Sequence, residues 1–111
     1  VYRVRRPDGS VAQLIGSVVE PDGRVRAVPG LRAEPGATWV SPTGRSYALG
    51  WRLVSDEFDL SVRAVRREQE LLSRAARIAY WEGPIEVTGT WAAAPAVGTG
   101  MMELVSGYWA P

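Results

Sequence analysis

Closely spaced turn sequences divide the first 45 residues of the chain into short pieces. Two of them read Pro-Asp-Gly, at Pro7-Asp8-Gly9 and Pro21-Asp22-Gly23. Proline pre-sets φ at the first central position of a turn, and glycine accepts the positive φ of its exit. Further breakers follow at Pro29-Gly30, Pro35-Gly36 and Pro42-Thr43-Gly44. The pattern predicts a meander of strands at about 1–6, 11–20 and 24–28, with a short extended piece at 38–40.

The next stretch has the most regular period-two pattern in the sequence. Tyr47, Leu49, Trp51 and Leu53 occupy alternate positions, and residues 58–64 alternate again after the acidic turn Asp56-Glu57. A period of two places alternate side chains on one face of a strand. We therefore expect a hairpin of two long antiparallel strands here.

Residues 66–79 follow a different pattern. They contain no Gly or Pro, and their leucines and alanines fit a helical stripe, so one short helix is expected near 67–78. Strands are then expected at about 80–91 and 98–108, joined by a loop containing 92–95. The chain is predicted to be all-β, with seven or eight strands closing into a barrel or a sandwich, because closure removes exposed sheet edges.

Composition excludes several classes of function. The 111 residues suit one domain, and a net charge of +1 argues against a nucleic-acid partner. No apolar run approaches the ~20 residues of a transmembrane segment, and no targeting signal opens the chain, so localisation stays open. The sequence contains no His, Cys, Lys or Asn. The usual metal ligands and the nucleophilic triads are therefore missing, and we expect neither a metal nor a cofactor.

The last third of the sequence carries a resemblance. Residues 80–90 read YWEGPIEVTGT, and 98–108 include GTGMMEL followed by Gly107-Tyr108. Three further motifs lie upstream, in this order: Asp8-Gly9-Ser10, the segment TWVSPTGRSY at 38–47, and Gln69-Glu70-Leu71. This arrangement resembles the AttH-like and carotenoid 1,2-hydratase (hydroxyneurosporene synthase) family over nearly the whole chain. The chain departs from the family pattern at an extra residue, Ser106, and in the long segment 72–79; both should affect local geometry more than fold.

The resemblance implies a lipocalin-like, calycin-type antiparallel β-barrel spanning residues 1–111. It also implies that this domain is the C-terminal half of a longer two-domain protein, with an N-terminal domain as its partner. A lipophilic ligand would then lie in or near the cleft between the two domains. The motifs linked to hydratase chemistry would lie upstream, so Val1 would continue a strand whose hairpin partner is outside this chain.

Glu82 is the one candidate catalytic residue. It lies between Trp81 and Gly83 on an expected strand, where a carboxylic acid could protonate an olefin or orient a ligand. A structural carboxylate paired with an arginine or a backbone N–H at the barrel rim is the alternative, and it is the more common case.

The aromatic residues are candidates for ligand binding. They could line an apolar cavity suited to a polyene or lipid, although small barrels also fill their interiors with aromatic rings. The candidates are Trp39, Tyr47, Trp51, Tyr80 and Trp81.

Two functions remain open at this point. In the first, the chain belongs to a cofactor-free enzyme that hydrates or cyclises a hydrophobic polyene, with its main catalytic residues outside this chain. In the second, it is a non-catalytic domain that binds a lipophilic ligand or supports an N-terminal catalytic domain.

Overall fold

The computed structural model describes residues 1–108, which form twelve β-strands. These residues contain no helix, which confirms the all-β prediction. In chain order the strands are β1 (Tyr2–Arg5), β2 (Val11–Ile15), β3 (Ser17–Val19), β4 (Val25–Ala27), β5 (Arg32–Pro35), β6 (Thr38–Val40), β7 (Ser46–Ala48), β8 (Gly50–Val54), β9 (Phe58–Ala64), β10 (Glu70–Ser73), β11 (Ile78–Trp91) and β12 (Ala94–Tyr108).

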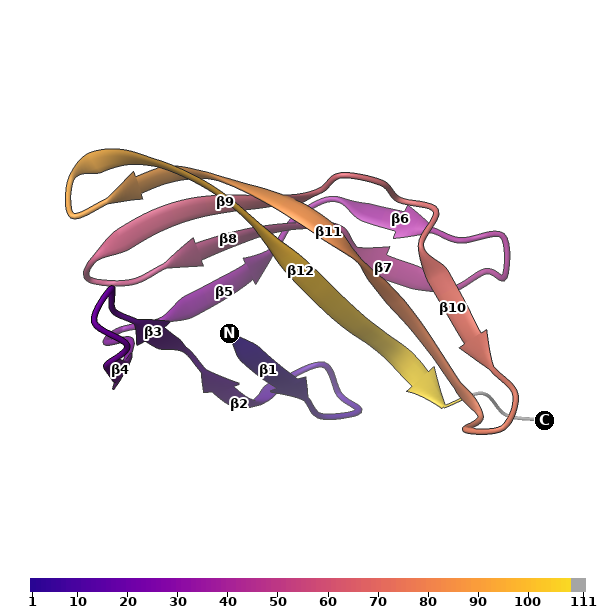
Figure 1. Ribbon diagram of the computed structural model, residues 1–111. Coiled ribbons are helices and arrows are strands. Elements are labelled where there is room, and N and C mark those ends of the chain that lie inside the picture. The colour runs from indigo at the N-terminus through magenta and orange to yellow at the C-terminus, as the bar shows by residue number, and fades with distance from the viewer. Residues whose placement is uncertain (109–111) are drawn as a thin grey trace.

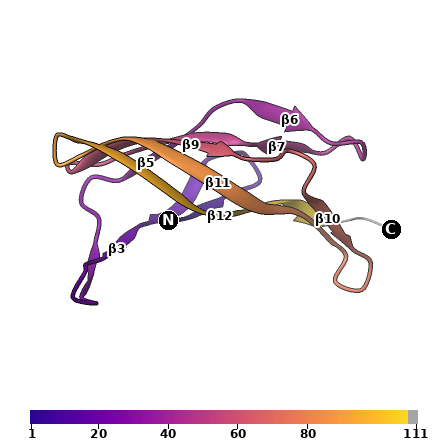
Figure 2. The same cartoon turned by 45° about the horizontal axis from the view of Figure 1, so that its top comes forward.

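Six of the strands form one antiparallel sheet, which curls into a half-barrel (Figures 1 and 2). The order is β10-β11-β9-β8-β5, and β12 pairs with β11 along its whole length. One edge of β11 is occupied by β12. The other edge is therefore shared by β10 and β9. β10 pairs with residues 78–81 of β11, and β9 pairs with residues 85–91.

The paired strands β5 and β8 continue directly into the β6–β7 hairpin, which lies between them in the chain. Between the two pairs, Gly36 N–H donates to the Gly50 carbonyl at 2.8 Å, and Leu49 N–H donates to the Ala37 carbonyl at 2.9 Å. The ladder therefore runs on through a short irregularity. β7 lies against β12 on the far side of the curl, so this end of the half-barrel is covered.

Period-two alternation gives the sheet two different faces. Along β9 the burial pattern alternates strictly, with Phe58, Leu60 and Val62 buried and the residues between them exposed. Cross-strand partners share a face, so the strand register extends this division across the sheet. We call the side that carries Val62 the inner face and the opposite side the outer face. The buried core residues are Tyr47, Phe58, Leu60, Val62, Ala79 and Trp81.

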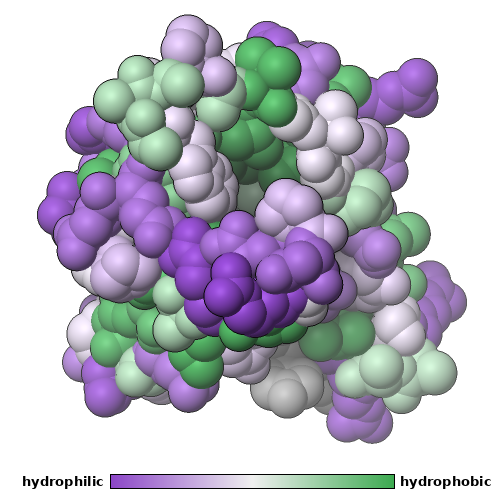
Figure 3. All heavy atoms as spheres, turned by 60° about the vertical axis from the view of Figure 1, so that its left-hand side comes forward, coloured by the Kyte–Doolittle hydropathy of each residue, from purple (hydrophilic) through white to green (hydrophobic). Residues whose placement is uncertain are grey.

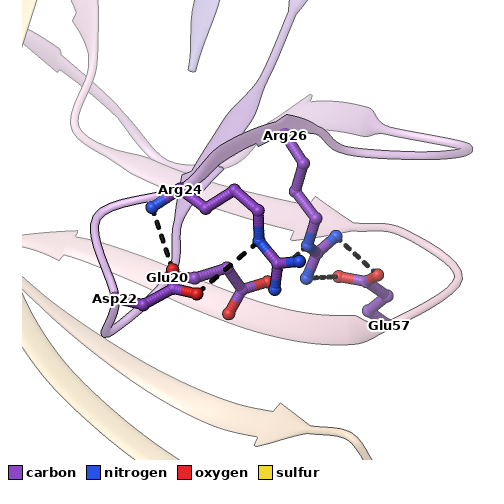
Figure 4. A network of polar contacts seen from close by, with 5 residues as sticks. All are labelled: Glu20, Asp22, Arg24, Arg26 and Glu57. Carbon is purple, nitrogen blue, oxygen red and sulfur yellow. Dashed lines mark hydrogen bonds and ion pairs between the residues drawn. The ribbon is translucent and has the colours of Figure 1, made fainter.

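The β3–β4 hairpin docks onto the turn between β8 and β9 through an ion-pair network (Figure 4). The Arg26 guanidinium contacts Glu20 on its own hairpin and forms a two-pronged pair with Glu57, at 2.7 and 2.9 Å. Hydrogen bonds and charge from Glu57, then Glu20, raise the pKa of Arg26 above its usual value. Figure 3, which brings this end of the molecule forward, shows hydrophilic side chains at its centre and hydrophobic ones around them and in a recess above.

The prediction of a helix near 67–78 is wrong. Residues 70–73 form β10, which pairs with the start of β11, and residues 74–77 form the turn between them. Arg77 has φ of 51°, in the left-handed region that a helix does not use. Strand pairing with β11 overrides the helical spacing of the leucines and alanines, because each β10 residue gains a ladder partner there.

The last hairpin is tighter than expected. The predicted loop containing 92–95 is a two-residue turn, Ala92-Ala93, and β12 already begins at Ala94. Both turn residues have positive φ, 48° and 62°, as a two-residue hairpin turn of type I′ requires.

Ser106 is the extra residue of a β-bulge. The register passes from Tyr80↔Val105 to Ala79↔Gly107, so Ser106 has no Cα partner on β11. A bulge inserts one residue and bends the strand locally while leaving the rest of the ladder intact. The extra residue thus changes local geometry and leaves the fold unchanged, as expected.

Candidate functional site

A cluster of polar side chains closes one end of the inner face. Tyr47 Oη lies 2.9 Å from Glu70 Oε1, and Thr43 Oγ1 lies 2.8 and 3.0 Å from the two carboxylate oxygens of Glu70. Ser41 Oγ and Thr43 Oγ1 are hydrogen-bonded at 2.8 Å. Ser106 Oγ completes the cluster, 3.5 Å from Tyr47 Oη.

Four segments supply this cluster, and the fourth is β12, which carries Ser106. Ser41 and Thr43 lie on the turn between β6 and β7, Tyr47 lies on β7, and Glu70 begins β10. Glu70 pairs with Trp81, which is fully buried, so its side chain is on the inner face. Thr43, in the turn containing Pro42-Thr43-Gly44, is hydrogen-bonded to the carboxylate, and Ser41 is hydrogen-bonded to Thr43. Gly44 accepts the φ of +81° that returns the chain to β7.

The environment of the cluster shifts both of its titrating groups. Burial raises the pKa of the Tyr47 phenol, and the neighbouring Glu70 carboxylate adds to this, while Ser106 opposes it. Burial alone would raise the pKa of Glu70. Hydrogen bonds from the hydroxyls of Thr43, Ser41 and Tyr47, with the charge of Arg45, outweigh it and hold that pKa below its usual value. At neutral pH the cluster is therefore a neutral phenol hydrogen-bonded to a carboxylate.

The sequence does not predict that these residues meet. The TWVSPTGRSY segment contains Ser41, Thr43 and Tyr47, and Glu70 lies in Gln69-Glu70-Leu71. No local pattern joins the two segments, since the contact depends on where β10 pairs. Of the cluster, only Tyr47 is a site residue predicted from the sequence.

The predicted aromatic residues separate into two groups. Trp39 pairs with Tyr47 across β6 and β7, with ring centroids 6.3 Å apart. Trp81 is fully buried on the inner face, and its indole N–H donates to the Arg67 carbonyl at 2.7 Å. Trp51 is half-buried on the same face. Tyr80 lies on the outer face beside Val105, because it precedes Trp81 on β11. A ligand-binding role for these residues stays a prediction.

Glu82 lies away from this cluster. It follows Trp81 on β11, so its side chain points to the outer face, where it is exposed and directly opposite Glu103 on β12. No hydrogen bond of its side chain is found among residues 1–108. The structure thus does not bring Glu82 together with Tyr47, Trp51 or Trp81.

Shallow hollows on the described surface include one on the outer face and one beside Trp39. The one on the outer face is lined by Arg52, Asp59, Ser61, Thr88, Gly89 and Thr90. The other lies at the irregularity between β7 and β8, next to Trp39, Arg63 and Arg67. In the part of the chain that the structure describes, there is no helix long and apolar enough to cross a membrane.

The curled antiparallel sheet, its apolar inner face and the hairpin covering one end define a lipocalin-like β domain. Residues 1–108 match the AttH-like family, and the chain belongs to that family. No match was found among the curated proteins.

Two solved structures share the fold. Kievitone hydratase from Nectria haematococca is 25% identical with a TM-score of 0.78, covering 96% of this chain and 34% of the hydratase. An AttH protein from Nitrosomonas europaea is 28% identical with a TM-score of 0.79, covering 97% of this chain and 33% of that protein. This chain thus spans about a third of the length of each.

Proposed function

We propose that this chain is the lipocalin-like domain of a hydratase-like protein that holds a hydrophobic, unsaturated substrate against the inner face of the sheet. The observation that carries the proposal is a set of apolar side chains on that face which the rest of the described chain leaves partly exposed. They are Trp51, Leu53, Ile85, Val87, Met102 and Leu104. The similarity to kievitone hydratase over 96% of the chain supports water addition as the reaction class.

Open space over β12 supports binding on this face. Gly98 and Gly100 lie opposite Val87 and Ile85 on the inner face. A Cβ placed on Gly98 would meet no atom within 4 Å, and one on Gly100 would only reach ordinary contact distance from Ile85. The sheet therefore has room above these glycines for an apolar chain, and burying such a chain is favourable at about 25 cal/mol per Å².

Water addition to an isolated double bond needs a proton donor at one carbon and a water molecule at the other. Among the strands of the sheet that the structure describes, Glu70 is the one carboxylate on the inner face, and its hydrogen bonds favour its ionised form. The proton donor is therefore proposed to come from outside this chain. The inner face then orients the substrate and excludes bulk water from it.

Oxygen-18 incorporation tests the proposal. The natural protein that contains this chain is incubated with a carotenoid or another polyene in H₂¹⁸O, and the product is expected to gain one labelled water. Met102→Gln should lower turnover, because Met102 lies on the inner face opposite Gly83. Met101→Gln is the matched control, since Met101 is its neighbour on the outer face and is 65% exposed. Equal effects of the two variants would contradict binding on the inner face.

A binding domain without its own chemistry is the second candidate. The hydrogen-bonded state of Glu70 favours it, because this carboxylate is already occupied by hydroxyl donors. Saturable polyene binding without any labelled product would establish this function. Glu82→Gln tests the catalytic candidate from the sequence: unchanged turnover would remove Glu82 from the mechanism.

A further inference from the structure

Arg3 places a positive charge on the apolar inner face. It lies on β1, is half-buried, and its guanidinium carbon is 5.3 Å from the centroid of the Trp51 ring. Trp51 pairs with the buried Val62, so the ring belongs to the inner face. The guanidinium therefore lies over the same face that carries the partly exposed apolar side chains.

The hydrogen-bonding edge of this guanidinium lacks an acceptor within the described chain. Arg3 Nε is the single buried side-chain nitrogen or oxygen of residues 1–108 that lacks a hydrogen-bond partner. Arg26, Arg52 and Arg63, in contrast, each pair with a carboxylate. A buried N–H donor without an acceptor costs free energy, and the face of the Trp51 ring attracts the cation without supplying a carboxylate or carbonyl acceptor. An acceptor that reaches this edge would remove the cost.

We propose that the inner face binds an amphipathic ligand whose carboxylate pairs with Arg3 and whose apolar body lies along the sheet. The inference rests on the proposed function, because it names the polar group of the molecule held there. A planar guanidinium pairs with a carboxylate through two parallel hydrogen bonds, which ammonium groups cannot do. Trp51 and Leu53 then contact the part of the ligand next to its carboxylate.

A polyene acid and its ester distinguish this inference from simple apolar binding. cis-Parinaric acid is a conjugated tetraene carboxylic acid that fluoresces in apolar surroundings, and its methyl ester keeps the chain without the charge. The natural protein is titrated with each probe, as are Arg3→Gln, Arg3→Lys and the control Arg5→Gln. Arg5 is an exposed arginine on the same strand, so its substitution removes the same charge.

The acid is expected to bind the unaltered protein about tenfold more tightly than the ester. Arg3→Gln should abolish that preference and leave ester binding unchanged, while Arg5→Gln should change neither. Arg3→Lys should keep part of the preference for the acid. It takes the place of Arg3→Gln in this comparison if Arg3→Gln does not fold.

Equal affinity of the unaltered protein for acid and ester would overturn the inference while leaving the proposed function intact. Equal losses for both probes in Arg3→Gln would assign Arg3 a structural role and overturn it as well. If neither probe binds the unaltered protein, the proposed function fails together with the inference.

Discussion

The phenol of Tyr47 donates a 2.9 Å hydrogen bond to the carboxylate of Glu70, a residue 23 positions away in the sequence. The bond joins β7 to β10, two strands that do not pair with each other. It therefore fastens the β6–β7 hairpin over the inner face at the end where β7 also lies against β12. In this half-barrel a side-chain hydrogen bond joins strands that no backbone ladder connects.

Tyr47→Phe should destabilise the domain by about 1–2 kcal/mol. The substitution keeps the buried ring and removes the donor, which leaves the Glu70 carboxylate with one hydrogen bond fewer. Urea unfolding measures the effect. Tyr80→Phe is the matched control, because no hydrogen bond of the Tyr80 hydroxyl is found among the described residues. Equal losses in the two variants would show that the Tyr47 hydroxyl contributes nothing specific.

Glu70 should make stability depend on pH on the acid side. Its pKa is lower in the folded state than the ordinary value of 4.5, so the unfolded chain binds the proton more readily. This contribution is present above pH 4.5 and is lost as pH falls through the lower folded value. Glu70→Gln should flatten the fall of the unfolding free energy below pH 4.5. Glu68→Gln should flatten it less, because Glu68 pairs only with exposed Arg67.

Gly83→Ala should destabilise the domain by about 1–3 kcal/mol. A Cβ at this buried position would lie 2.8 Å from Cη2 of the fully buried Trp81, so the indole would have to shift. Gly98→Ala is the control on the neighbouring strand, where a Cβ would meet nothing within 4 Å. Thermal denaturation compares the two. A neutral Gly83→Ala would mean that the indole can shift.

Ala93→Gly should stabilise the domain by about 0.5–1 kcal/mol. Ala93 has φ of 62° in the turn between β11 and β12, a conformation that costs an L-residue with a Cβ more than it costs glycine. Ala96→Gly, three residues later within β12, should instead destabilise by a similar amount, because glycine weakens a strand interior. Opposite shifts of the melting temperature are expected, and shifts of the same sign would contradict the interpretation.

Arg26→Gln should lower stability more than Arg24→Gln. Arg26 joins the β3–β4 hairpin to Glu57 on another turn, whereas Arg24 contacts only Asp22 on its own hairpin, and both of those side chains are largely exposed. Exposed pairs contribute little because water and salt screen them. Chemical denaturation at low and high salt measures both variants. A salt-sensitive loss confined to Arg26→Gln is the expected result.

Local patterns in the sequence determined much of the strand arrangement. The Pro-Asp-Gly turns lie between strands where expected, and residues 58–64 form one strand paired with β8. The single long strand expected over 47–53 is instead divided at Leu49 between β7 and β8, and β7 pairs with β6 in a separate sheet. These features depend on two or three adjacent residues, or on a period of two, so they can be read without knowledge of the fold. The same holds for the long final hairpin, whose strands differ from the prediction only at their ends.

Only the tertiary structure decided the long-range strand pairing and the contacts that depend on it. Residues 70–73 have a helix-compatible pattern, and they form a strand because β11 offers them a free edge. The partners of Tyr47 and Arg26 likewise lie on segments 23 and 31 residues away. Which strand edges meet depends on the path of the whole chain. Residue patterns therefore determined which segments are extended, and long-range pairing determined which side chains came together.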